Sequence, residues 1–274
     1  MAQGADEVLY EVRGPKTLLE MTWEEVEAVR KASQIALIPL GSTESHGMHL
    51  PMGADTFQGY DFARGILARL AARGVPAVSA PCMPFGVNYH MMPFPGTLTI
   101  SADTMRRIIL EVGGSLVAHG FTKLALVLGH GGNFPAMQIA AQELVERHDC
   151  QAIALNWLPY LTARYHELLA GGAREGHGGE SETARMLVSA PRLVRLDRAQ
   201  PHYPAPPTGK IEKDEPPVYG GGVARGSRSF KSVSPYGHVG DPSRATRELG
   251  EHIYALCCDW MTAVILREFA PDKA

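Results

Sequence analysis

The sequence contains few cysteines, no surplus of positive charge and no long apolar run. Its 274 residues include only 4 cysteines, without CxxC spacing, so a disulfide framework is excluded and reduced thiols are expected. The formal net charge of -3 argues against nucleic acid or an anionic membrane as the main partner. No stretch approaches roughly 18 consecutive apolar residues, which predicts no membrane span. Residues 1–13 lack the apolar core of a signal peptide, so we expect a cytoplasmic protein.

Short apolar runs alternate with stretches of helical periodicity along most of the chain. Strands are predicted at 35–40, 75–81, 123–128 and 152–157, and helices at 56–72, 101–119, 135–147, 182–189 and 244–267. This alternation predicts an α/β fold with a mostly parallel central sheet covered by helices on both faces. We expect residues 1–274 to form a single domain, in which a Pro- and Gly-rich stretch at about 191–242 is a lid, an oligomer contact or an insertion.

The first polar segment that could bind a metal or take part in catalysis follows the strand at 35–40. Glu44 and His46 are two residues apart, so their side chains point to the same side of an extended backbone, and Asp55 follows at the start of the next helix. Carboxylates and imidazoles are preferred ligands of Zn²⁺, Mn²⁺ and Fe²⁺. The segment also lies beyond the carboxyl end of a strand, where open α/β sheets bind ligands. Taken alone, it could still be a polar loop with incidental acidic residues and histidines.

Two glycine-rich segments with a histidine come later in the chain. His130 stands in a Gly-His-Gly-Gly run after the strand at 123–128, where glycines let the backbone approach a ligand closely. This run matches neither the dinucleotide nor the phosphate-loop pattern. His177 is followed by Glu180 and Glu182, one of which could simply favour a helix N-terminus. The three segments together predict a metal site more specifically than any one of them.

A fourth segment, residues 84–97, is rich in glycine and proline and offers candidates for substrate binding. Asn88 and His90 could bind polar atoms of a substrate, although His90 could equally be a structural loop residue. Trp157, the one tryptophan predicted near a strand end, is a third candidate for contact with the substrate.

Five motifs, in order along the chain, resemble those of the creatininase (creatinine amidohydrolase) family. They lie at residues 41–55, 90–97, 129–133, 177–183 and 240–242. The resemblance spans roughly residues 20 to 265 and implies a three-layer α/β/α fold with two divalent metal ions per subunit, Zn²⁺ or Mn²⁺. It also implies a homo-oligomer, often a hexamer.

The resemblance further implies a division of the metal ligands. Glu44, Asp55 and His130 would hold one ion, whereas His46, a bridging Asp55 and a glutamate would hold the second. In creatininase itself, that glutamate lies two residues after the histidine that corresponds to His130.

This chain has Gly132 at that position, so Glu180 is expected to replace the missing glutamate. His177 and Glu182 match the pair that handles protons in the family. These two residues are therefore the expected catalytic residues.

The expected function is metal-dependent hydrolysis of the C–N bond of an amide or cyclic amide in a small polar molecule. A metal-bridging hydroxide would attack the carbonyl, and His177, oriented by Glu182, would protonate the leaving nitrogen. Creatinine itself is not expected, because residues 169–175 contain no aromatic residue that matches the tryptophan-bearing loop of creatininase. Two alternatives stay open: hydrolytic ring opening of a keto-cyclitol or keto-sugar, and a metal-dependent sugar isomerase.

Overall fold

The computed structural model describes residues 7–170, 175–204 and 229–270, and its centre is a sheet of four parallel strands. These strands are β1 (Ile35–Leu40), β2 (Val78–Ser79), β3 (Lys123–Leu128) and β4 (Gln151–Leu155), in the order β2-β1-β3-β4. Every residue of β1 is buried. Leu40 is paired with Leu128, so β1 and β3 end side by side. The segments that follow these two strands therefore leave the sheet at the same point.

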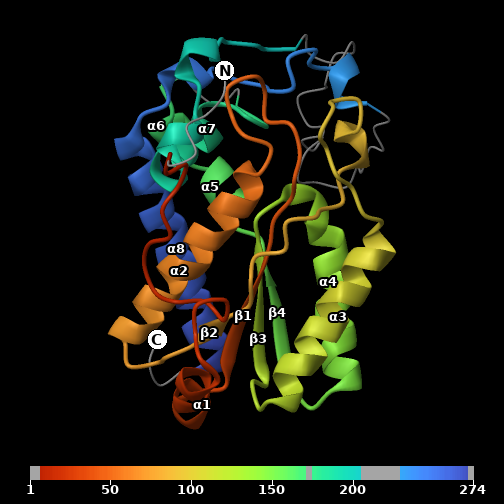
Figure 1. Ribbon diagram of the computed structural model, residues 1–274, viewed down its shortest axis with the longest axis vertical. Coiled ribbons are helices and arrows are strands. Elements are labelled where there is room, and N and C mark those ends of the chain that lie inside the picture. Colours follow the sequence, from red (N-terminus) through yellow and green to blue (C-terminus); the bar gives the residue numbers. More distant parts are fainter. Residues whose placement is uncertain (1–6, 171–174, 205–228, 271–274) are drawn as a thin grey trace, which may run out of the picture.

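Helices cover both faces of the sheet (Figure 1). One face carries α3 (Ala102–Ala118) and α4 (Phe134–Arg147), which pack together, and the other carries α2 (Ala54–Ala72) and α8 (Arg247–Phe269), with α7 (Glu180–Ser189) against both. This arrangement confirms the three-layer α/β/α fold. The strand order reverses direction between β1 and β3, and open α/β sheets bind their ligands at such a point.

Two of the predicted strands are shorter in the structure. The strand predicted at 75–81 is reduced to Val78–Ser79, because Pro76 and Pro81 have no N–H to donate and the Val75 N–H bonds to the Leu70 carbonyl at 3.0 Å. The strand predicted at 152–157 ends at Leu155, since Trp157 is already the N-cap of α5 (Leu158–Thr162). The first run therefore stops pairing early because of proline, and the second because a helix begins.

The structure also contains helices that were not predicted. α1 (Trp23–Ala32) begins with a capping box, in which Thr22 and Glu25 each bond the other's backbone, so the sequence did hold its signal. α6 (Tyr165–Leu168) is a single turn. Short 3₁₀ segments are η1 (Tyr89–Met91), η2 (Gly131–Asn133), η3 (Pro191–Leu193), η4 (Leu196–Arg198), η5 (Phe230–Ser232) and η6 (Pro242–Arg244).

The Pro- and Gly-rich stretch at about 191–242 is described only at its two ends, since residues 205–228 lie outside the described residues. His202 and Gly240 pair through two backbone hydrogen bonds of 2.9 and 2.8 Å, so the two described ends of the stretch lie side by side. The returning end carries Phe230, whose ring lies 5.3 Å from that of His177. Its role as lid, oligomer contact or insertion stays a prediction, as does the single domain.

In the part of the chain that the structure describes, α8 is the one helix long and apolar enough by composition to cross a membrane. Half of its most apolar window is buried inside the protein, where α8 packs against α2 and α7. Cys257 and Cys258 lie on this buried side, and all four cysteines are free. The helix is thus placed as a core helix would be.

Candidate metal centre

Four of the predicted metal ligands meet beyond the ends of β1 and β3, and Asp55 lies between the other three. Its Oδ1 is 3.1 Å from His46 Nε2, and its Oδ2 is 3.0 Å from His130 Nδ1. Glu44 Oε1 is 3.2 Å from the same His130 nitrogen. All four side chains are buried. The structure therefore brings Glu44, His46, Asp55 and His130 into one cluster, as the sequence predicted.

Backbone carbonyls fix the orientation of the two histidine rings. His46 Nδ1 donates to the Glu44 carbonyl at 3.1 Å, and His130 Nε2 donates to the Val87 carbonyl at 3.3 Å. The opposite ring nitrogen of each histidine faces the carboxylates and remains available as an electron-pair donor. This is the arrangement in which metal-binding histidines are usually held.

The electrostatics of the cluster favour positive charge at its centre. Burial alone would lower the pKa of His46, but the neighbouring Asp55 carboxylate raises it to about 10. Glu44, with Asp55, likewise holds the pKa of His130 well above its usual value against the effect of burial. The pKa of Asp55 is in turn depressed, because His46 and His130 outweigh the desolvation of this carboxylate. The carboxylates thus attract either protons or cations.

The donor set fits divalent metal ions. Both carboxylate oxygens of Glu44 and Oδ2 of Asp55 are buried without a well-aligned hydrogen bond, because the one nearby nitrogen, His130 Nδ1, is shared between Glu44 Oε1 and Asp55 Oδ2. A bound cation would satisfy these oxygens. Mixed carboxylate and imidazole donors are preferred by Zn²⁺ and accepted by Mn²⁺. Among the described residues, three groups have ligand atoms within 4.8 Å of one another: Glu44, Asp55 and His130; His46, Asp55 and Glu182; and Glu44, His46 and His177.

The structure places Glu182, not the expected Glu180, beside His46. Glu182 Oε2 is 3.8 Å from His46 Nε2 and accepts the Gly178 N–H at 2.6 Å. Glu180 Oε1 accepts the Ala170 N–H at 3.0 Å instead, and Glu180 belongs to none of the three groups found among the described residues. Residues two apart on an α-helix point about 200° apart, so only one of these glutamates can face His46.

Position 132 explains why a glutamate must come from elsewhere in the chain. A Cβ atom on Gly132 would lie 2.3 Å from the Val87 carbonyl oxygen and 2.5 Å from His130 Nε2. No side chain fits there without moving the backbone of the neighbouring loop. Close packing therefore requires a glycine at position 132.

His177 reaches the same cluster from the segment before α7. Its Nε2 donates to the Ser45 carbonyl at 2.5 Å, and its Nδ1 lies 3.6 Å from Glu44 Oε1. Its ring lies against that of His46 in a tilted arrangement, with 4.2 Å between centroids and 30° between the planes, and the side chain is 20% exposed. Because it keeps one nitrogen free toward the carboxylates and is open to solvent, His177 is placed to exchange a proton or to act as a further ligand.

Arg185 is a site residue that was missed in the sequence. It is 1% exposed and donates to Gln58 Oε1 at 2.6 Å, to Ser181 Oγ at 2.7 Å and to Glu182 Oε1 at 3.5 Å. Its guanidinium lies over the Trp157 ring at 4.9 Å. The three-residue spacing from Glu182 puts both side chains on one face of α7, and this spacing was readable beforehand.

The three candidates for substrate binding lie in different surroundings. Asn88 is fully buried, and its amide nitrogen donates a hydrogen bond to Ser42 Oγ at 2.6 Å. Trp157 is buried in the hydrophobic core, where its indole N–H donates to the Leu128 carbonyl at 2.7 Å, so the structure does not place it at a substrate-accessible surface. His90 is half-buried, and its ring lies 6.3 Å from that of Phe230, which also contacts His177.

The family profile described as creatinine amidohydrolase matches residues 19–265. The chain belongs to the creatininase family. It is 33% identical over 236 residues to a mycofactocin precursor peptide peptidase of Mycobacterium ulcerans (strain Agy99), covering 84% of each chain. It is 28% identical over 272 residues to the creatinine amidohydrolase of Pseudomonas putida, covering 92% of this chain and 96% of the relative.

A third relative of this creatininase-family protein is a 3-dehydro-scyllo-inosose hydrolase of Thermotoga maritima, 27% identical over 228 residues, with 80% of this chain and 68% of the relative covered. The crystal structure of creatinine amidohydrolase superimposes with a TM-score of 0.72 at 26% identity, covering 93% of this chain and 98% of the other. A solved creatininase described as the manganese form matches equally well, with a TM-score of 0.72 at 26% identity over 93% and 100% of the two chains. The named relatives are all hydrolases.

Proposed function

We propose that this creatininase-family protein is a dinuclear metal-dependent hydrolase that cleaves the C–N bond of an amide in a peptide or another small polar molecule. The observation that carries the proposal is the position of Asp55, which turns one carboxylate oxygen toward His46 and the other toward His130. One carboxylate can thereby serve two metal ions. A single bound ion could be coordinated by only one of these two pairs, Asp55 with His46 or Asp55 with His130, and the other pair would hold no ion.

The two proposed ligand groups follow the geometry of the cluster. Glu44, Asp55 and His130 would hold one ion, and His46, Asp55 and Glu182 would hold the other. This assignment replaces Glu180 by Glu182. Divalent ions bound there would polarise a carbonyl oxygen and make water more acidic.

His177 would hold the proton that the leaving nitrogen needs. Its Nε2–H is committed to the Ser45 carbonyl, so Nδ1 is the nitrogen that can carry this proton toward the cluster. Phe230 stands edge-on to the His177 ring, with 5.3 Å between ring centroids. In this arrangement, Glu182 is a ligand, and its expected role of orienting His177 is not part of the proposal.

The choice of an amide as substrate rests on the names of two relatives, a peptide peptidase and an amidohydrolase, both of which name C–N bond hydrolysis. The 3-dehydro-scyllo-inosose hydrolase keeps the ring opening of a keto-cyclitol as the second candidate, because it is similar over 80% of this chain. Both reactions add water to a carbonyl, so one cluster can serve either.

Mass spectrometry of the products tests the proposal. The protein loaded with Zn²⁺ or Mn²⁺ is incubated separately with short peptides, formamides, cyclic amides and keto-cyclitols. We expect cleavage of an amide with the gain of one water, and no turnover by an Asp55→Ala variant prepared in parallel. Turnover of keto-cyclitols alone would support the second candidate, and a product of unchanged mass would indicate an isomerase. Equal turnover by the variant would trace the activity to a contaminant.

The assembly and the cellular location also remain proposals. We propose a homo-oligomer in the cytoplasm, without nucleic acid or membrane partners. Light scattering of the purified protein measures the assembly directly. A monomer at micromolar concentration would contradict it.

A further inference from the structure

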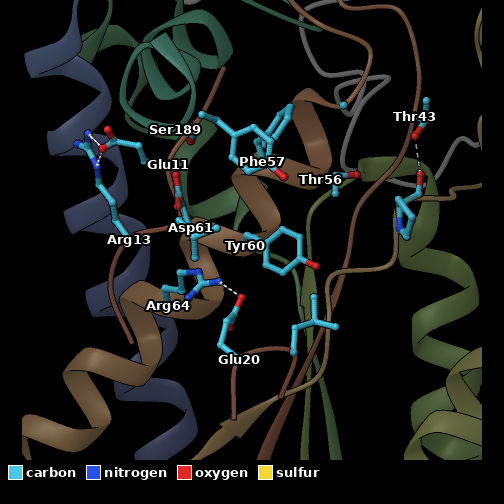
Figure 2. Close-up of a pocket in the computed structure, with 15 residues that line it drawn as sticks. Glu11, Arg13, Glu20, Thr43, Thr56, Phe57, Tyr60, Asp61, Arg64 and Ser189 are labelled. Carbon is cyan, nitrogen blue, oxygen red and sulfur yellow. Dashed lines mark hydrogen bonds and ion pairs between the residues drawn. The ribbon is translucent and has the colours of Figure 1, made fainter. Parts of the chain in front are cut away.

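A cavity lies next to the metal cluster but shares no residue with it (Figure 2). It has a volume of about 470 Å³ and is enclosed by the N-terminal segment at residues 10–20, the first half of α2 and Pro84. Thr43 and Thr56 line it, whereas their chain neighbours Glu44 and Asp55 belong to the cluster. Cavities of this size are typical of sites for small molecules.

One face of α2 forms the main wall. Phe57, Tyr60, Asp61 and Arg64 follow the spacing that aligns side chains along a helix, and Figure 2 shows them beside the N-terminal segment. Tyr10 comes from that segment and meets Phe57 edge-on, with 5.0 Å between ring centroids. Three aromatic rings and the Asp61 carboxylate thus line the same space.

Most of the charges around the cavity are already paired. Arg13 pairs with Glu11 on the N-terminal segment, and Arg64 pairs with Glu20 at 2.9 Å. Arg64 also donates to the Pro15 carbonyl at 2.6 Å. These two ion pairs cancel in charge.

Asp61 is the exception. It has no ion-pair partner within 4.0 Å in the described part of the chain, although the other four charged residues that line the cavity have one. Burial raises the pKa of the Asp61 carboxyl, and the Ser189 hydroxyl offsets this effect only in part. The cavity wall therefore carries one uncompensated negative charge that is partly shielded from water.

We propose that this cavity binds a small organic cation, namely a primary ammonium group on an aromatic or aliphatic body. The ammonium would donate to Asp61 and supply the missing positive charge, because a partly buried carboxylate gains most from a charged donor. The body would lie against Tyr10, Phe57 and Tyr60, whose ring faces attract cations. Since the cavity and the metal cluster have no residue in common, this site is independent of the proposed hydrolase function.

Calorimetric titration of the metal-loaded, full-length protein tests the site. The probe is 2-phenylethylammonium at pH 7, compared with the neutral 2-phenylethanol and the anionic phenylacetate. We expect one ammonium bound per chain, and binding of the alcohol and the anion weaker by about tenfold or more, as loss of a charge-assisted hydrogen bond implies. Equal affinity for alcohol and ammonium, or no binding of the ammonium at millimolar concentration, would overturn the proposal.

Variants locate the binding. Asp61→Asn keeps the shape of the side chain and should weaken ammonium binding by about tenfold or more. Glu111→Gln removes an equal charge from the exposed face of α3 and should leave binding unchanged. Tyr10→Ala alters only a half-exposed residue of the N-terminal segment and should weaken binding about two- to fivefold, even if Asp61→Asn folds poorly. Unaltered binding in Asp61→Asn would place the amine elsewhere, for example at the metal ions, and would overturn the assignment.

Discussion

The guanidinium of Arg185 lies 3.5 Å from the carboxylate of Glu182, and the two residues are one turn apart on α7. Arg185 is almost completely buried and also donates to Gln58 of α2, so its own side chain is held in one position. Glu182 is thereby fixed from two sides, by Arg185 at Oε1 and by the Gly178 N–H at Oε2. This pairing orients the glutamate toward His46.

Arg185→Gln should weaken the binding of one metal ion per chain by about 10-fold or more, the usual effect of removing a residue that orients a ligand. The other ion should bind as before, because Arg185 does not contact Glu44 or His130. Titration with a chelator measures both affinities. Arg107→Gln, which removes an exposed cation from α3, is the matched control. Unchanged affinities in Arg185→Gln would show that Glu182 needs no such support.

Glu182→Gln and Glu180→Gln should differ in metal content. Only Glu182 lies beside His46, so Glu182→Gln should bind about one ion and Glu180→Gln about two. Elemental analysis after gel filtration counts the ions. Two ions in Glu182→Gln and one in Glu180→Gln would restore the ligand set expected from the sequence.

Asp55→Ala should lose both ions, because each of its carboxylate oxygens faces a different histidine. The metal content is again measured by elemental analysis, with circular dichroism to confirm that the fold is intact. Asp103→Ala, on the exposed start of α3, should keep its metal. One ion retained in Asp55→Ala would disprove the bridging role.

His177→Ala should retain both ions but lose roughly 10²–10⁴ in turnover, the range for a positioned proton donor. The reason is that His177 donates to a backbone carbonyl and lies 3.6 Å from Glu44, outside the two proposed ligand groups. Metal content and turnover are measured on the same preparation. Loss of a full ion would instead identify His177 as a ligand.

Glu175→Gln should remove a pH dependence of stability. Burial raises the pKa of Glu175 from 4.5 to about 8, although the Glu180 and Ser181 N–H groups donate to it. The folded protein then holds a proton that the unfolded chain has lost, so this contribution to stability is complete below pH 4.5 and disappears as the pH rises through about 8. Relative to Glu175→Gln, the parent should therefore lose free energy of unfolding between these pH values. Parallel curves from urea denaturation would contradict the raised pKa.

The sequence alone determined the class of fold and the place of the site. Apolar runs at 35–40 and 123–128 are too short for helices and were predicted as buried strands, and the helical stretches between them favour a parallel sheet. Parallel strands place their carboxyl ends at one edge, so the polar residues after each strand had to meet there. With the resemblance to the creatininase family, Glu44, His46, Asp55 and His130 could be grouped as one ligand set without a structure.

Only the tertiary structure decided which other side chains join them. The sequence does not distinguish Glu180 from Glu182 as a ligand. The angle at which α7 starts turns Glu182 toward His46 and Glu180 toward Ala170. Trp157 was a candidate because it was predicted near a strand end, and Asn88 because it lies in a glycine- and proline-rich loop, yet packing buries both. The partner of Arg185 on α2 and the unpaired charge of Asp61 depend on contacts between segments far apart in the chain. Such contacts have no local pattern in the sequence, because they are set by how whole helices pack.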